Sequence, residues 1–282
     1  MKRQAVIFIH GIGDQSDGFS MAMEDKLRKL IPDQIDDLGG EGDPEPPVFR
    51  EALWAKVTSG PQTELWKRVR RSHDLDLVKL RKFFVTFGGD AVAYQLDGDQ
   101  DVVYSAVNAV VQEQIDSIHL EFPNDKFEYT FIAHSLGTIV VSNFLYDQSK
   151  AKGIKATNLF TLGSPLAIWT LRYGGPTKAT SPAKVARPNG AWINILDDED
   201  IIGYPLRDLN QQYKDAVDMD YVTEIGGLIS MGNPLSHVGY WTDRNVLKPI
   251  SRKLAIDYMR IKHKVPYKKN SYLRYIRKLW NF

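Results

Sequence analysis

Residues 131–141 read FIAHSLGTIVV, and they carry the strongest structural signal in the sequence. An apolar run typical of a buried strand leads into Ser135, and a helix-like pattern follows it. A residue on such a sharp strand-to-helix turn needs very small neighbours two positions before and two positions after it, because larger side chains would collide where the backbone doubles back. Ala133 and Gly137 meet that demand. The stretch predicts that Ser135 is a nucleophile; the alternative is that it only caps the helix.

Strand-like runs recur on both sides of this turn. Short apolar runs bounded by Gly, Pro, Asn or Asp occupy residues 5–9, 48–54, 127–133, 158–162 and 191–196. Apolar residues at helical spacing occupy residues 21–30, 101–120 and 137–146. Uninterrupted apolar runs suit strands buried on both faces of a parallel sheet, and their alternation with helices indicates a doubly wound arrangement. We therefore expect an α/β fold with a mostly parallel sheet flanked by helices.

The length and composition favour one domain. The 282 residues are 43% apolar, which is enough to bury one large core, so we expect a single domain over 1–282. Residues 60–98 replace the sheet pattern with aromatic and apolar residues set among Arg and Lys, and we predict that they form an inserted helical cap. Residues 174–190 are rich in Gly, Pro, Ala, Ser and Thr, which predicts a long irregular loop.

Composition also excludes several kinds of protein. The chain has no Cys, so disulfides, thiolate metal sites and Cys nucleophiles are excluded. Lys and Arg number 36 against 35 Asp and Glu, so no overall field favours nucleic acid as a partner. The first apolar run, residues 5–9, is too short for a signal peptide, and no run approaches the roughly 20 apolar residues that span a bilayer. We expect a cytoplasmic protein without a metal or cofactor.

A second motif lies near the N-terminus, where the apolar run ends in His10, Gly11, Ile12 and Gly13. Backbone N–H groups in such a loop can stabilise a developing oxyanion, and Gly lets a substrate approach closely. We expect the amides of Ile12 and Leu136 to form this oxyanion hole, and His10 to order the loop by hydrogen bonding rather than act as a base. The competing interpretation is a phosphate-binding loop, but neither GxGxxG nor GxxxxGK[ST] occurs.

The general base is expected later in the chain than the nucleophile. For a Ser on this kind of turn, the acid and then the His follow in chain order. Of the six His residues only His237 and His263 follow the acid candidates. His263 lies in the basic run 261–264, where no carboxylate is at hand to orient it, whereas His237 lies in a loop flanked by Gly and Pro. His237 is the predicted base; the alternative is an ordinary polar surface residue.

The acid is expected where the strand-like run 191–196 ends, because four acidic residues follow it: Asp197, Asp198, Glu199 and Asp200. A carboxylate there would hold the base in the correct tautomer and stabilise the imidazolium that forms during attack. The alternatives are solvated loop acids or a calcium site, although the ligand spacing of a calcium loop does not follow. Residue chemistry alone does not choose among the four.

These landmarks together resemble the α/β-hydrolase superfamily, in particular intracellular bacterial serine hydrolases related to lipases and esterases. The resemblance covers residues 5–240, and residues 161–166, TLGSPL, also look like the strand and turn that such lipases carry after the nucleophile helix. In the family the acid is usually followed by one residue of any type and then by Val or Ile. The resemblance therefore implies Asp200, followed by Ile201 and Ile202, with Asp198 in reserve.

Two features depart from the family pattern. The usual residue two positions before the nucleophile is Gly, and this chain has Ala133. The first strand-like run already carries the predicted oxyanion loop, so the two leading strands of the full fold are expected to be missing, as in the trimmed cores of lipase-like members.

The resemblance implies a serine esterase or lipase. Ser135, His237 and Asp200 would form a catalytic triad that cleaves a small-molecule or lipid carboxylic ester through an acyl-enzyme, with His134 and the residues around Ile12 in support. The alternatives are a phospholipase or acyltransferase acting at a membrane surface, which would use the same residues, and a catalytically silent interaction module.

Residues 251–282 are strongly basic, with ten Lys and Arg against Asp257 alone, and they carry interleaved aromatic residues. One interpretation is peripheral contact with an anionic membrane. The other is a last helix followed by a solvated tail that packs through its aromatic residues. No recognised nucleic-acid-binding motif is present.

Overall fold

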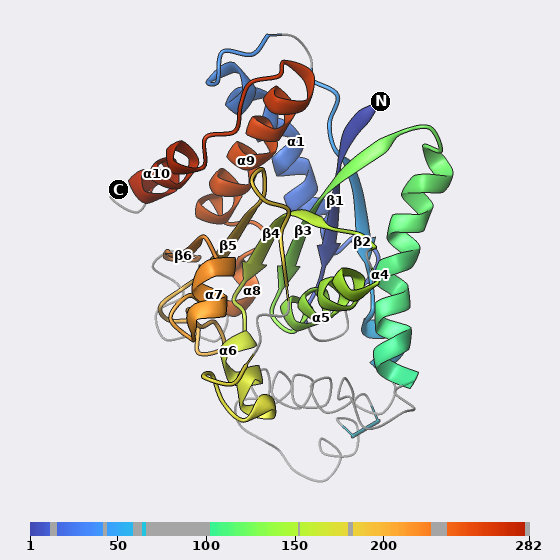
Figure 1. Cartoon of the computed structure of the whole chain (residues 1–282), viewed down its shortest axis with the longest axis vertical. Coiled ribbons are helices and arrows are strands. Elements are labelled where there is room, and N and C mark those ends of the chain that lie inside the picture. The colour runs from blue at the N-terminus through green and yellow to red at the C-terminus, as the bar shows by residue number, and fades with distance from the viewer. Residues whose placement is uncertain are drawn as a thin grey trace.

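The computed structural model describes residues 1–11, 16–41, 44–58, 64–65, 102–151, 153–179, 183–226 and 236–279. Within these ranges the chain forms a six-stranded sheet in the order β2-β1-β3-β4-β5-β6, and every neighbouring pair is parallel (Figure 1). The strands are β1 (Lys2–Ile9), β2 (Val48–Ala52), β3 (Lys126–His134), β4 (Ala156–Leu162), β5 (Ala191–Leu196) and β6 (Met219–Val222).

Helices cover both faces of this sheet (Figure 1). They are α1 (Met21–Asp36), α4 (Val102–Glu121), α5 (Gly137–Lys150), α6 (Leu166–Trp169), α7 (Gln211–Ala216), α8 (Ser236–Gly239), α9 (Arg244–Lys262) and α10 (Lys269–Leu279), with a 3-10 turn, η2 (Thr170–Tyr173), after α6. One core contains buried residues of α4, α5 and α7, and the other contains buried residues of α1, α9 and α10.

The two cores follow from the alternation of side chains along each strand. In β1, Ala5, Ile7 and Ile9 belong to the core on the α4 and α5 side, whereas Val6 and Phe8 belong to the core on the α1 and α9 side. All five are fully buried. The uninterrupted apolar run in the sequence is therefore the signature of a strand that is covered on both faces.

The predicted α/β class with a parallel sheet is confirmed, and each of the five predicted strands is present. The helices extend beyond their predicted ends: α1 continues past Pro32 to Asp36, and α5 continues to Lys150. Sequence reasoning missed β6, which is only four residues long and alternates buried with half-buried positions. The predicted cap over 60–98 lies outside the described residues, apart from Glu64 and Leu65.

The basic C-terminal segment begins inside a helix, because α9 starts at Arg244 and Ser251 lies in its interior. A further helix, α10, follows where a solvated tail was the alternative prediction. Tyr272, Leu273 and Ile276 of α10 are buried in the second core, so these residues are not free to enter a membrane. None of the helices in the described ranges is long and apolar enough to cross a bilayer.

Candidate active site

Ser135 lies on the turn between β3 and α5, where its φ of 52° is in the left-handed region. A residue other than Gly rarely adopts this conformation, and such strain is concentrated at functional sites. The turn is held by neighbouring backbone, since the Ser135 amide donates to the carbonyl of Leu162 at the end of β4 (2.9 Å). The chain therefore reverses sharply at the residue that the sequence predicts to be the nucleophile.

Two glycines let the end of β1 approach this turn. A Cβ on Gly137 would lie 2.2 Å from the carbonyl oxygen of His10, and a Cβ on Gly11 would lie 2.6 Å from the Cβ of Ser135. Neither position has room for a side chain, because the contacting atoms belong to backbone or to the Ser135 side chain itself. The contact between β1 and the start of α5 thus explains why position 137 has no side chain.

The structure brings Ser135, His237 and Asp200 into one hydrogen-bonded chain. The Ser135 Oγ lies 2.7 Å from His237 Nε2, and His237 Nδ1 lies 2.8 Å and 2.9 Å from the two carboxylate oxygens of Asp200. A carboxylate only accepts, so Nδ1 carries the proton and Nε2 of the neutral ring accepts from the Ser135 hydroxyl. All three side chains are buried. His263, the other candidate base, caps the far end of α9 beside Tyr258.

Asp200 is held by more than His237. The amide of Ile202 donates to Oδ1 (2.9 Å), and the hydroxyl of Tyr240 donates to Oδ2 (2.9 Å). Burial is the largest influence and raises the pKa of Asp200, but the hydrogen bonds and charge of His237, together with Ile202 and Tyr240, outweigh it and leave the pKa below its ordinary value. The carboxylate is therefore ionised at neutral pH, as an orienting acid must be.

The other acids of the cluster point elsewhere. Asp197 accepts from the amides of Glu199 and Ile225 (both 2.9 Å), and burial raises its pKa. Asp198 is exposed. Asp197 therefore supports the backbone of this loop, and the geometry pairs Asp200 with His237, which residue chemistry alone did not decide.

Sequence reasoning missed three residues that enclose the Asp200 carboxylate. Tyr240 bridges the loop, since its hydroxyl donates to Asp200 and accepts from the amide of Asp197 (2.9 Å). A Cβ on Gly163 would lie 2.7 Å from Asp200 Oδ2, and one on Gly203 would lie 2.9 Å from the same atom. The signal for Tyr240 was its position three residues after His237, which is one helical turn.

His134 supports the segment that carries His237. Its Nε2–H donates to the backbone carbonyl of His237 (2.5 Å), and the two rings lie 4.8 Å apart. Burial, followed by the nearby charge of His237, lowers the pKa of His134 to about 3. His134 is therefore neutral near pH 7 and acts as a hydrogen-bond donor, in line with the supporting role expected for it.

His10 orders the end of β1. Its Nδ1–H donates to the carbonyl of Gly11 (2.7 Å), and its Nε2 accepts from the amide of Ala55 (3.2 Å). Trp54 stacks on the ring at 5.1 Å and donates its Nε1–H to the His10 carbonyl (2.9 Å). Burial lowers the pKa of His10 to about 4. Both ring nitrogens are occupied by backbone groups, so His10 is placed to order the loop and not to act as a base.

Of the two amides predicted to form the oxyanion hole, only that of Leu136 lies within the described residues. Ile12 and Gly13 lie outside the described residues. Leu136 is buried at the start of α5, and within the described part of the chain no backbone group accepts a hydrogen bond from its amide. That amide directly follows Ser135, as an oxyanion donor after a nucleophile must.

These residues meet at one edge of the sheet. Gly11 follows β1, Ser135 follows β3, Gly163 follows β4, and Asp200 lies just beyond β5. The carboxyl ends of parallel strands are where open α/β sheets place their ligand sites. No cluster of acidic or His side chains in the described ranges could hold a metal ion.

The fold and site define an α/β protein with a buried Ser–His–Asp chain at the carboxyl edge of a parallel sheet. A scan against protein-family models gives no match to this chain, and no curated protein matches its sequence. Any more specific assignment therefore depends on the chemistry of the site.

Proposed function

We propose that the protein is a serine hydrolase of the α/β-hydrolase type that cleaves carboxylic ester bonds. The observation that carries this proposal is the hydrogen-bonded chain from Ser135 through His237 to Asp200, at 2.7 and 2.8 Å. The strained turn at Ser135 and the parallel sheet are compatible with it. The sheet is not the full sheet of that family, since the two leading strands have no counterpart within the described residues.

In the proposed reaction His237 removes the proton of Ser135, and the resulting alkoxide attacks the acyl carbonyl. Asp200 keeps the ring in the productive tautomer and stabilises the imidazolium. The imidazolium then returns its proton to the leaving alcohol, and water resolves the acyl-enzyme with the same base. The substrates are small-molecule or lipid esters.

The amides of Leu136 and Ile12 are the proposed donors to the tetrahedral oxyanion. Loss of one such donor costs about 3 to 4 kcal/mol of transition-state stabilisation. Gly11 would serve the same step, because only a residue without a side chain lets the end of β1 lie against Ser135.

The decisive experiment compares Ser135→Ala with Ser142→Ala on p-nitrophenyl esters. Ser142 lies on α5 and is also buried, but its hydroxyl has no hydrogen-bond partner among the described residues, so it matches Ser135 in chemistry without belonging to the triad. We expect Ser135→Ala to abolish hydrolysis and Ser142→Ala to retain it. Hydrolysis by Ser135→Ala at the wild-type rate would refute the proposal.

A fluorophosphonate probe separates the enzyme from a silent interaction module. Such probes label a serine only when its hydroxyl is activated, as the contact with His237 predicts. We expect labelling of the wild type and of Ser142→Ala, and none of Ser135→Ala. Absence of labelling in all three would favour the silent module.

A further inference from the structure

A hollow of about 200 Å³ lies between α9, α10 and the residue Leu38 that follows α1. It is distant from the proposed catalytic site. His237 precedes the start of α9, whereas Ile256 and Met259 line the hollow from its last turns. At 1.5 Å per residue, Met259 lies about 22 Å along the helix axis from Arg244. A ligand in this hollow would therefore occupy a second site.

Most of the lining is apolar or aromatic. Ile256 and Met259 contribute from α9, Val265 from the segment after it, and Tyr275 from α10. Val265 is 45% exposed, which leaves an apolar side chain facing water at the edge of the hollow. Pockets with such walls bind apolar groups and use a few polar groups to fix orientation.

The charged residues of the lining are both basic, Arg252 and Lys268, and no carboxylate lines the hollow. Arg252 donates to the side chain of Gln34 (3.1 Å) and lies over the ring of Tyr275, and the exposed carboxylate of Asp37 is 3.7 Å away. Lys268 is exposed and has no ion pair within the described part of the chain. The hollow thus combines apolar walls with a net positive edge.

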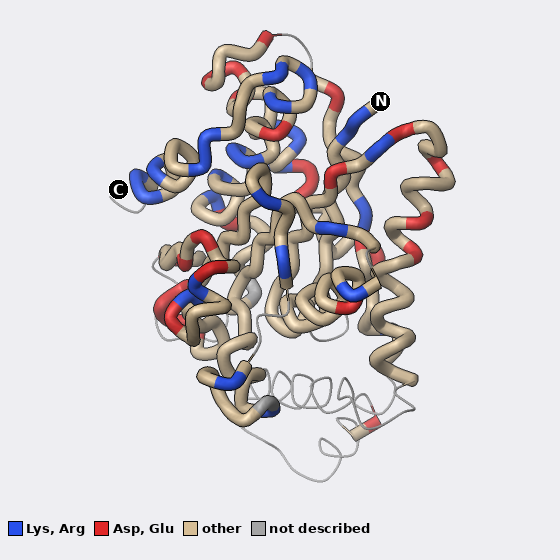
Figure 2. The backbone as a smooth tube through the Cα atoms, viewed as in Figure 1, with Lys and Arg blue, Asp and Glu red and all other residues tan. Residues whose placement is uncertain are grey.

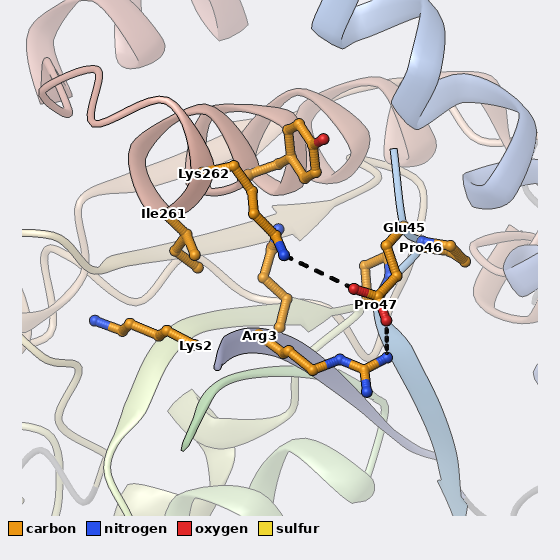
Figure 3. A pocket seen from close by; sticks show the side chains of 9 residues that line it. Lys2, Arg3, Glu45, Pro46, Pro47, Ile261 and Lys262 are labelled. Carbon is orange, nitrogen blue, oxygen red and sulfur yellow. Dashed lines mark ion pairs between the residues drawn. The ribbon is translucent and has the colours of Figure 1, made fainter. Parts of the chain in front are cut away.

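A smaller hollow beside β1 shows the opposite case (Figure 3). There Glu45 reaches between Arg3 and Lys262 and forms an ion pair with each. The cations of that hollow already have a carboxylate from the chain itself. At the hollow at α10, Arg252 pairs only with the exposed Asp37, which does not line the hollow, and Lys268 has no ion pair among the described residues. Figure 2 shows Lys and Arg gathered along the neighbouring helices α9 and α10.

We propose that the hollow at α10 binds the anion of a free single-chain fatty acid. The acyl chain would lie against Ile256, Met259 and Tyr275, and the carboxylate would face Lys268 and Arg252. Burying the chain supplies the hydrophobic contribution, and the surrounding basic helices raise the local concentration of anions. The site is non-covalent and does not depend on the proposed hydrolysis.

The test titrates dodecanoate into the full-length Ser135→Ala protein by calorimetry, so that the proposed nucleophile is absent. Dodecyltrimethylammonium is the matched ligand, since it has the same chain and the opposite charge. We expect saturable binding of one dodecanoate per chain and binding of the cation that is at least about tenfold weaker. No binding of dodecanoate, or equal binding of the two ligands, would overturn the proposal.

Variants then locate the site. Lys268→Glu places a negative charge at the edge and is expected to weaken dodecanoate binding about tenfold. Lys278→Glu makes the same charge change on exposed α10 surface outside the lining and is expected to leave binding unchanged. Equal weakening by both would show that the basic helices attract anions in general, as they would attract an anionic membrane. This result would overturn the assignment to the hollow.

The last set of variants fills the hollow or changes its edge. Ile256→Trp is expected to abolish binding, and Val265→Asp, at the exposed edge, tests the same point with less demand on folding; thermal melts verify that each variant folds. Wild-type binding by a folded Ile256→Trp or Val265→Asp overturns the proposal. Hydrolysis of p-nitrophenyl esters by Lys268→Glu is expected to equal that of the wild type, so the outcome for this site and the outcome for the catalytic proposal are read separately.

Discussion

At the scale of single residues, Asp200 is the carboxylate that faces the ring of His237, and its replacement tests the triad most sharply. Asp200→Asn preserves the shape but presents an amide, which favours the wrong tautomer of the base. We expect kcat for p-nitrophenyl butyrate to fall about ten-thousandfold. Asp198→Asn removes an exposed carboxylate of the same loop and is expected to keep the wild-type rate. A similar loss in both variants would contradict the assignment of Asp200.

The buried histidines His10 and His134 make stability depend on pH. Burial lowers their pKa values to about 4 and about 3, whereas a histidine in the unfolded chain titrates near 6.5. Below about pH 6.5 the unfolded state binds protons that the folded state does not, so stability is fully present above that pH and is lost as the pH falls toward the folded values. Between about pH 7.5 and about pH 5 we expect a loss of about 2 kcal/mol for each histidine.

Urea unfolding at the two pH values measures this loss, and His134→Gln provides the comparison. Glutamine keeps a hydrogen-bond donor for the carbonyl of His237 but does not titrate, so the variant should lose about 2 kcal/mol less than the wild type over the same range. An identical loss in the two proteins would show that His134 is not the group responsible.

At the scale of elements, Gly137 sets the distance between β1 and α5. A methyl group there would lie 2.2 Å from the carbonyl oxygen of His10 and 2.8 Å from that of Ile9, so the helix must move away from the strand. We expect Gly137→Ala to lower the free energy of unfolding by about 1 to 3 kcal/mol. Because the shift displaces the Ser135 turn, we also expect a loss of activity of about a hundredfold.

Ser149→Ala is the matched control for Gly137→Ala. Ser149 lies at the exposed end of α5, where its hydroxyl donates only to the carbonyl of Tyr146 (2.6 Å). Urea unfolding and ester hydrolysis are expected to resemble those of the wild type. Gly137→Ala with wild-type stability would mean that the contact between β1 and α5 is not close.

The short helix α8 carries His237, and Tyr240 directly follows its last residue. Tyr240→Phe removes the donor to Asp200 and leaves the amide of Asp197 without its acceptor, which costs about 1 to 3 kcal/mol of stability. The lost hydrogen bond also raises the pKa of Asp200. As the pH is lowered, the variant should therefore lose activity at a higher pH than the wild type does. Tyr204→Phe is the control, because the hydroxyl of Tyr204 donates to the Ile201 carbonyl at an exposed position. This variant should leave the pH profile of activity unchanged.

The elements that sequence predicts well are those whose signal is local. The strand β3, the turn at Ser135 and the helix α5 follow one another within residues 126–150, so periodicity and two small residues suffice to place them. The strand β6 was missed because it is an edge strand of four residues, Met219–Val222, which is too short to show the apolar run of the central strands. The ends of α1 and α5 were missed because helix ends depend on tertiary packing.

At the scale of the whole molecule, local sequence patterns do not predict contacts between residues that come from different strands of the sheet. Tyr240 meets Asp200 only because α8 and the end of β5 converge, and the order of residues does not say which acid of the cluster is chosen. The resemblance to a family supplied Asp200, and the contact with His237 agrees with it. Nothing in the sequence pattern indicated that Lys253 and Asp257 are both buried within the basic C-terminal segment.

That pair ties α9 to the sheet. Lys253 Nζ lies 2.7 Å from both carboxylate oxygens of Asp257, and Asn158 of β4 donates to the same carboxylate (2.8 Å). Arg260 also donates to Asp257 (3.2 Å). The two partners are therefore unequal. Asp257 accepts from further donors, whereas Lys253 also contacts the carbonyl of Asn189 (3.2 Å) and the ring of Tyr267 (4.4 Å) but forms no ion pair with another carboxylate within the described residues.

This inequality predicts an order of destabilisation. Asp257→Asn leaves the fully buried ammonium of Lys253 without its counterion, which should cost about 3 to 5 kcal/mol. Lys253→Met should cost less, because Arg260 and Asn158 still face the carboxylate. Urea unfolding at neutral pH measures both, and Lys248→Met, on the half-buried surface of the same helix, is the control with little effect. A larger loss for Lys253→Met than for Asp257→Asn would mean that the carboxylate, not the ammonium, depends on the pair. Ester hydrolysis by either variant, while it remains folded, should equal that of the wild type, because Lys253 and Asp257 make no contact with Ser135, His237 or Asp200.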